Sequence, residues 1–258
     1  GKQMIRSFYT AVSGMIVQEA KQDVITNNLA NVNTVGFKQD DLKSTIFNEV
    51  LIQNYDKIVN GKNVRNVIGS MTLGSKIDSV NTGFTQGTIE STDISTDFAI
   101  EGRGFFTVRR EDGNEFYTRD GHFHVNTQGI LVDDSGNTVI GRDNQTGALG
   151  AINVGSGEIT SDAYGNISID GNERYKIYTV DFNDYNALTK VGDNLYTGEN
   201  AREINTVVRQ KSLEKSNVNL VNTMSDLITT MRAFETDQKV VQSIDGTLDK
   251  LINEAGKV

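Results

Sequence analysis

The first apolar pattern along the chain has the period of an α-helix. Apolar residues recur at steps of mostly three and four from Ile5 through Val12 to Val24, with charged and hydroxyl residues between them. This spacing places the apolar side chains on one face and predicts an amphipathic helix from about Met4 to Leu29. Gly14 inside it costs about 1 kcal/mol relative to Ala, which is tolerated where another backbone passes closely.

A second helical pattern begins at about Ser216. Its apolar residues follow one another at alternating steps of four and three, close to a heptad repeat, at Leu220, Met224, Leu227, Met231 and Phe234. Both apolar stripes are too narrow for a helix that is buried on all sides. We therefore predict that the two end helices pair as a coiled-coil-like stalk, with apolar surface left over that suits packing against copies of the chain.

Between the helices, from about Asn60 to Asn200, short apolar runs alternate with turn signals. Phe105–Val108 predicts a strand, and Arg110–Glu115 (REDGNE) and Asp133–Asn137 (DDSGN) predict hairpin turns. The fold class is therefore α+β, with a central antiparallel all-β domain that forms a sandwich or partial barrel. The predicted domains are an N-terminal helix and hinge at 1–59, the β domain at 60–200 and the C-terminal helix at 201–258.

The end of the first helix is rich in asparagine. Asn favours caps and turns over helix interiors, and like Gly it tolerates the left-handed conformation. We expect this segment to end the helix and to act as a hinge toward the β domain, with Phe37 pinning the outgoing chain by burial. The hinge residues are Asn27, Asn28, Asn31, Asn33 and Gly36.

Composition narrows the classes of function. The 258 residues contain no Cys, which excludes disulfides and thiolate sites, and no Pro, which leaves the turns to Gly, Asn and Asp. The formal net charge is −9, and no basic run is longer than Arg109-Arg110, so nucleic acid is not expected as a partner. The longest early apolar run is Met15–Val17, and we expect neither a cleaved signal nor membrane insertion. We interpret Gly1–Gln3, ahead of Met4, as a cloning remnant.

Signatures of catalysis are absent from the sequence. It contains no P-loop, dinucleotide fingerprint, nucleophile elbow or zinc-protease motif, so no catalytic or cofactor-binding residue is proposed. The only histidines, His122 and His124, would share one face of a strand, but a metal site needs a third ligand. We favour two surface residues that flank a buried Phe123. The turn at Asp133–Asn137 lacks the spacing of a calcium loop.

Several stretches, taken together and in order, resemble the flagellar basal-body rod and hook family. They cover nearly the whole chain: SFYTAVSGM with NNLANVNTVGFK, then Phe84–Val108, Tyr117–Gly141, Val191–Gly198 and Leu213–Glu235. The sequence departs from the family at Ser95-Thr96, where Pro is frequent, and in the short stretch before Leu213. Features of proximal- and distal-rod members are mixed, so the subclass stays open.

The resemblance implies a structural role. Family members are exported through the flagellar secretion apparatus without a cleaved signal, and their paired end helices form the inner tube of a helical rod that carries torque from motor to hook. The implied partners are copies of the chain, other rod and hook proteins and the export apparatus, in the basal body.

The residues that we favour for assembly combine the apolar stripes with the end of the first helix. They are Phe8, Val12, Met15, Leu29, Phe37, Leu220, Met224, Leu227, Met231 and Phe234. Three alternatives remain: a hook-like axial protein, an adhesin-type module with a coiled-coil stalk, and a cell-wall hydrolase carried by the rod. The first would need another domain, and the last an acidic pair in a cleft.

Overall fold

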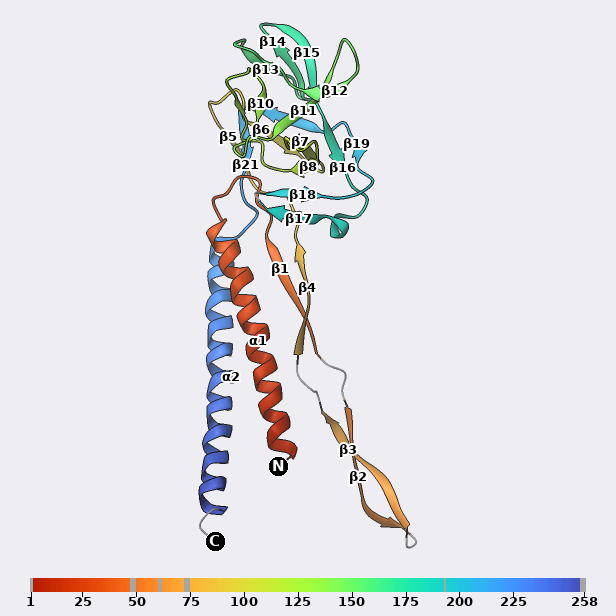
Figure 1. Cartoon of the computed structure of the whole chain (residues 1–258), viewed down its shortest axis with the longest axis vertical. Coiled ribbons are helices and arrows are strands. Elements are labelled where there is room, and N and C mark those ends of the chain that lie inside the picture. Colours follow the sequence, from red (N-terminus) through yellow and green to blue (C-terminus); the bar gives the residue numbers. More distant parts are fainter. Residues whose placement is uncertain (1, 47–49, 60–61, 72–74, 193, 256–258) are drawn as a thin grey trace. The chain divides into compact units, whose positions relative to one another are not determined.

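The computed structural model describes residues 2–46, 50–59, 62–71, 75–192 and 194–255, with side-chain exposure for 7–45, 75–192, 194–250 and 253. The chain forms two compact units (Figure 1). Unit 1 contains Gly1–Leu29, Asp40–Asn81 and Leu220–Val258, and unit 2 contains Ala30–Gln39 and Thr82–Asn219. Gly1, part of the predicted cloning remnant, lies outside the described residues.

Unit 1 contains two long helices, α1 (Lys2–Ala30) and α2 (Leu220–Ala255), close to the limits that the apolar periodicity predicts. At Gly14 of α1, an added methyl group would lie 2.9 Å from Oδ2 of Asp237 in α2. The close neighbour of this glycine is therefore a carboxylate, where the sequence led us to expect a backbone. The strands of this unit pair as β1 with β4 and β2 with β3; they are β1 (Asp40–Ile46), β2 (Val50–Val59), β3 (Lys62–Met71) and β4 (Ser75–Thr82).

Unit 2 is built from short strands and one turn of 3₁₀ helix, η1 (Tyr185–Ala187). The strands are β5 (Ile89–Ser91), β6 (Phe98–Glu101), β7 (Phe105–Arg109), β8 (Glu115–Thr118), β9 (His124–Val125), β10 (Leu131–Val132), β11 (Thr138–Asp143), β12 (Leu149–Ala151), β13 (Ile159–Ser161), β14 (Asn166–Ile169), β15 (Asn172–Ile177), β16 (Thr179–Asp181), β17 (Thr189–Gly192), β18 (Leu195–Thr197), β19 (Arg202–Glu203), β20 (Val207–Gln210) and β21 (Ser212–Glu214).

Antiparallel pairing dominates unit 2, as the turn spacing predicts. Among the described residues the largest sheet has 13 strands, in which β7 pairs with β8, β11 and β16. Two further pairs, β20 with β6 and β21 with β5, bring the last strands back onto the first ones of the unit. Strands also occur outside 60–200. β1 and β2 lie in the stretch that we assigned to the hinge, and β19, β20 and β21 lie in the stretch that we assigned to the C-terminal helix. The three-part domain division stays a prediction.

The core of unit 2 consists of a larger cluster and a smaller, mainly aromatic one. Phe106, Phe123 and Ile152 belong to the larger cluster, which combines aromatic and aliphatic side chains from the main sheet and from the β6–β20 pair. Phe105, Phe182 and Tyr196 belong to the smaller one, where rings meet edge to face or tilted at centroid distances of 4.9–5.9 Å. Such ring contacts stabilise a core beyond simple burial and fix the positions of the strands that carry them.

Two hairpin turns show how a chain without Pro makes its turns. At Asp133 and at Asp162 the carboxylate accepts hydrogen bonds from backbone N–H groups two and four residues later, and from an Asn side chain four residues later. A glycine with positive φ follows at the third position in both turns. The prediction that Asp, Asn and Gly supply the turns is confirmed.

Candidate functional site

The first turns of α2 present apolar side chains to solvent. We call them the α2 stripe: Leu220, Val221, Met224, Ile228 and Met231, each between 46 and 75 % exposed. At 3.6 residues per turn they cover about a third of the helix circumference. An isolated subunit therefore leaves a continuous apolar surface uncovered, and surfaces of this kind mark protein–protein contacts.

The other residues favoured for assembly differ in exposure. Phe8 on α1 is exposed, and so are Tyr9 and Ile16 on the same helix. Five residues are half-buried: Val12, Met15, Leu29, Leu227 and Phe234. Phe37 is only 2 % exposed and lies under the ammonium group of Lys190, 4.2 Å from the ring centroid. It therefore serves the packing of unit 2, as the expected pinning of the outgoing chain requires.

The buried side of α2 is not the side that the apolar stripe predicts. Thr223 and Thr230 are buried, and Asp237, the next residue at this seven-residue spacing, is the one that approaches Gly14. Burial raises the pKa of the Asp237 carboxyl. The sequence pattern did not predict that Thr223, Thr230 and Asp237 face the inside of unit 1, because Thr and Asp on a helix are ordinarily assigned to the solvent side.

Two of the asparagine side chains in this segment form hydrogen bonds that help to order it. α1 continues through Asn27 and Asn28 and ends at Ala30, within one residue of the predicted end at Leu29. The Asn28 side chain donates to the backbone O of Asp40 at 2.7 Å and accepts from its N–H at 2.9 Å. The chain that leaves α1 is thereby tied to the start of β1. Asn27 and Asn33 are exposed, and Asn31 accepts from the hydroxyl of Thr34.

Gly36 occupies a position that only glycine fits. Its φ of +66° is left-handed, and a Cβ there would lie 2.4 Å from the backbone N of Asp120. Its own N–H donates to the backbone O of Glu214 at 2.7 Å. The hinge residue predicted from the sequence is thus clamped between two other segments of unit 2.

Replacing Gly36 with Ala is expected to destabilise unit 2 by roughly 3 kcal/mol, since left-handed strain of about 1–2 kcal/mol adds to a clash with backbone atoms. Gly113→Ala is the matched control, because Gly113 also has positive φ but nothing lies within 4 Å of its Cβ position. Its cost is the strain alone, about 1–2 kcal/mol. Urea unfolding of both variants measures the difference, and equal losses would disprove the clamp.

Next to Gly36, three charged side chains form a buried network. Glu214 is fully buried, and Lys38 and Arg119 are 1 and 5 % exposed. Oε1 of Glu214 accepts from Lys38 Nζ at 2.7 Å and from the N–H of Gly87 at 2.9 Å, while Oε2 accepts from Arg119 at 2.7 Å. Burial lowers the pKa of Lys38, and the carboxylate of Glu214 opposes this shift. The network joins the segment after α1, the strand β21 and the main sheet.

Arg119 uses its whole guanidinium group in this network. Besides the two nitrogens on Glu214, its Nη1 donates to the backbone O atoms of Gly102 and Gly104 at 2.9 and 2.7 Å, and Nη2 donates to that of Ile100 at 3.2 Å. A buried charge with every donor satisfied holds its neighbours in one geometry. The sequence offers no signal for this arrangement, because Lys, Glu and Arg are ordinarily assigned to the surface.

The histidines do not come together as metal ligands. His122 Nδ1 lies 2.8 Å from the buried carboxylate of Asp97, and His124 lies 3.7 Å from Asp134. Burial lowers the pKa of His122, but the hydrogen bond and charge of Asp97 outweigh it and raise the pKa overall. Phe123 between them is buried, as predicted. In the described part of the chain, no three His, Asp or Glu side chains are grouped as a metal site. None of the described helices combines the length and the hydropathy that a membrane span requires.

Three family models match the chain in order. The model described as flagella basal body rod protein matches residues 8–38, which contain most of α1 and the asparagine-rich segment. The model described as flagellar hook protein FlgE/F/G D1 domain matches residues 99–174, within unit 2. The flagellar basal body rod FlgEFG protein C-terminal model matches 209–254, which contain Glu214 and nearly all of α2.

Curated relatives cover the same chain from end to end. The flagellar basal-body rod protein FlgG of Buchnera aphidicola subsp. Schizaphis graminum is 32 % identical, over 96 % of this chain and 99 % of its own. FlgG of Bacillus subtilis is 31 % identical over 97 and 99 %, and the flagellar hook-basal body complex protein FlhO of the same species is 27 % identical over 99 and 100 %. The chain therefore belongs to the flagellar basal-body rod protein family.

Proposed function

We propose that this chain, a structural subunit of the flagellar basal-body rod, assembles with copies of itself through its two terminal helices into a helical tube. The observation that carries the proposal is the exposed α2 stripe, supported by the exposed Phe8 on α1. Head-to-tail contacts between identical subunits produce an open filament when the rotation does not close a ring. Repetition of the same apolar contact along the tube would make a stiff shaft that transmits torque from motor to hook.

The pairing of α1 with α2 as a coiled-coil-like stalk is part of this proposal. It is supported by the short distance between the Cβ position of Gly14 and Asp237, and by the burial of Val17, Ile25 and Thr230. The paired helices would then serve as the inner part of the tube and the β domain as its outer part. Asn28, Gly36 and the residues around them would set the direction of the chain between these parts.

The partners follow from the same reasoning. We propose copies of the chain and other rod and hook proteins as neighbours, and the flagellar export apparatus as the route of delivery. Apolar burial at about 25 cal/mol per Å² is the main driving force that the helices offer. We propose no enzymatic activity, because the relatives carry the names of rod and hook-basal body proteins.

Electron microscopy of basal bodies from a strain that lacks the chain tests the role in the rod. We expect rods that stop short and carry no hook, with full length restored when the chain is supplied from a plasmid. The place where the rod stops would also assign the chain to a rod segment. Rods of normal length with hooks attached would refute the proposal.

A further inference from the structure

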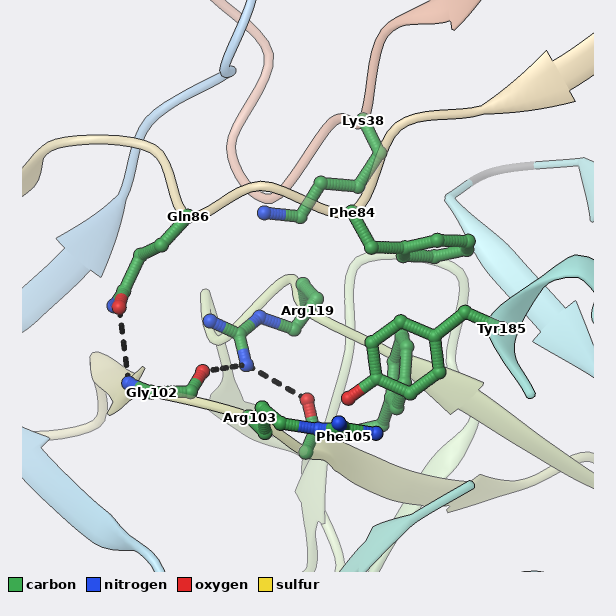
Figure 2. A pocket seen from close by; sticks show the side chains of 9 residues that line it. Lys38, Phe84, Gln86, Gly102, Arg103, Phe105, Arg119 and Tyr185 are labelled. Carbon is green, nitrogen blue, oxygen red and sulfur yellow. Dashed lines mark hydrogen bonds between the residues drawn. The ribbon is translucent and has the colours of Figure 1, made fainter. Parts of the chain in front are cut away.

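Beside the buried network, unit 2 contains a pocket of about 230 Å³. Figure 2 shows Lys38, Arg119 and Arg103 among the residues that line it, together with the rings of Phe84 and Tyr185, the latter next to Arg103. Three cationic side chains and several aromatic walls thus surround one small space. The pocket has no part in the contacts proposed above for the helices.

The charges next to the pocket do not balance. Lys38 and Arg119 are both buried, and Glu214 is the only carboxylate that forms ion pairs with them among the described residues. Its oxygens are already occupied by Lys38, Arg119 and the N–H of Gly87. Two buried cations against one anion leave an excess of one positive charge, which in a medium of low dielectric favours a further anion nearby.

Arg103 supplies an accessible cation at the same pocket. Its Nε lies 3.2 Å from Asp181, Nη2 donates to the backbone O of Phe182 at 2.9 Å, and the guanidinium lies 4.7 Å above the ring centre of Tyr185. Its side chain nevertheless remains 63 % exposed. The group is therefore fixed in orientation while part of its donor set faces solvent, a geometry suited to a carboxylate.

We propose that this pocket receives a carboxylate group from an acidic side chain of a second copy of the chain. The inference rests on the proposed assembly into a rod. Each copy carries 34 Asp and Glu residues against 25 Lys and Arg residues, so carboxylates are available on every neighbouring subunit. The aromatic rings that line the pocket can contact the CH₂ groups of such a side chain. Arg103, together with the excess positive charge of Lys38 and Arg119, can bind its carboxylate. Contacts of this kind fix register between subunits more than they add affinity.

The first experiment examines the pocket in the full chain at a dilution where light scattering shows monomers. Sodium acetate is titrated at constant ionic strength, with chloride as reference, while NMR follows the backbone amides of Gly102 and Gly104. We expect a saturable shift with acetate that weakens at least fivefold in Arg103→Gln. Arg209→Gln is the control, because Arg209 forms an exposed ion pair with Glu101 and should bind acetate like the wild type. Equal shifts with acetate and chloride would overturn the proposal.

The second experiment identifies the source of the carboxylate. Assembly of the wild type and both variants is followed by light scattering and electron microscopy. We expect Arg103→Gln to assemble at least tenfold more slowly, with a thermal midpoint within about 4 °C of the wild type, and Arg209→Gln to assemble normally. Acetate binding without an assembly defect in Arg103→Gln would overturn the second copy as occupant. If the wild type fails to assemble, both the proposed function and the second copy as the source of the carboxylate are wrong. The acetate titration tests carboxylate binding in the pocket independently of assembly.

Discussion

Replacing Glu214 with Gln is expected to destabilise unit 2 by about 3–5 kcal/mol, because it leaves Lys38 and Arg119 buried without an anion. The side chain keeps its size, so the loss reports charge and not packing. Since a single domain has a total stability of only about 5–15 kcal/mol, much of the variant should be unfolded at moderate denaturant concentrations. Urea unfolding, followed by circular dichroism, measures the change.

Two companion variants make this prediction specific. Glu203→Gln removes a carboxylate from an exposed pair with Arg142, and we expect a loss below about 1 kcal/mol. Lys38→Met removes a cation and leaves Arg119 with Glu214 as a balanced pair, so its cost should be smaller than that of Glu214→Gln. A loss in Glu214→Gln no larger than in Glu203→Gln would show that the buried network does not hold unit 2 together.

Replacing Met231 with Asp is expected to prevent rod assembly while leaving the subunit folded. Met231 is about half exposed in the single chain, so the change should alter the stability of the monomer by no more than about 0.5 kcal/mol. In an assembled rod the new carboxylate would be buried without a partner, at a cost of several kcal/mol per contact. A cost near 3 kcal/mol raises the concentration needed for assembly by roughly 100-fold.

Thr229→Asp is the matched control for this variant. Thr229 is exposed on α2 but lies well away from the stripe around the helix, so an added charge there should remain in water. Motility and electron microscopy of basal bodies compare the two variants, with immunoblots to show equal amounts of protein. Normal rods with Met231→Asp, or equal defects in both, would show that the α2 stripe is not an assembly surface.

Local patterns predicted the local parts of the fold. β7, the turn after it and β8 follow directly from the short apolar runs on either side of the turn signal at Arg110–Glu115, and the pairing of Val108 with Phe116 confirms the hairpin. The pairing of β21 with β5 joins Leu213 to Glu90, across more than 100 residues. No neighbouring residue encodes such a contact, because it depends on how the intervening sheet closes. The strands at 202–214 therefore escaped a reading based on local periodicity.

The helices show a different limit of the same reasoning. A pattern rule equates apolar residues with the buried face of the same chain. On α2, Met224 and Met231 are exposed while Thr223 and Thr230 are buried. The rule identifies an apolar stripe, but it cannot tell whether a partner that covers the stripe lies in the same chain or in another one, and the assembly role of these residues stays a prediction. Lys38 and Glu214 escaped notice for the opposite reason, because charged residues are buried only where a partner far along the chain neutralises them.

Thiol labelling shows directly whether neighbouring subunits cover the α2 stripe in the rod. Because the chain has no Cys, Met231→Cys introduces a single thiol on the stripe. We predict that a maleimide reagent labels this thiol rapidly in dilute subunits, leaves it unlabelled in intact basal bodies, and labels it again when the same basal bodies are dissociated. Equal labelling of intact basal bodies and free subunits would show that the α2 stripe stays exposed to solvent in the rod.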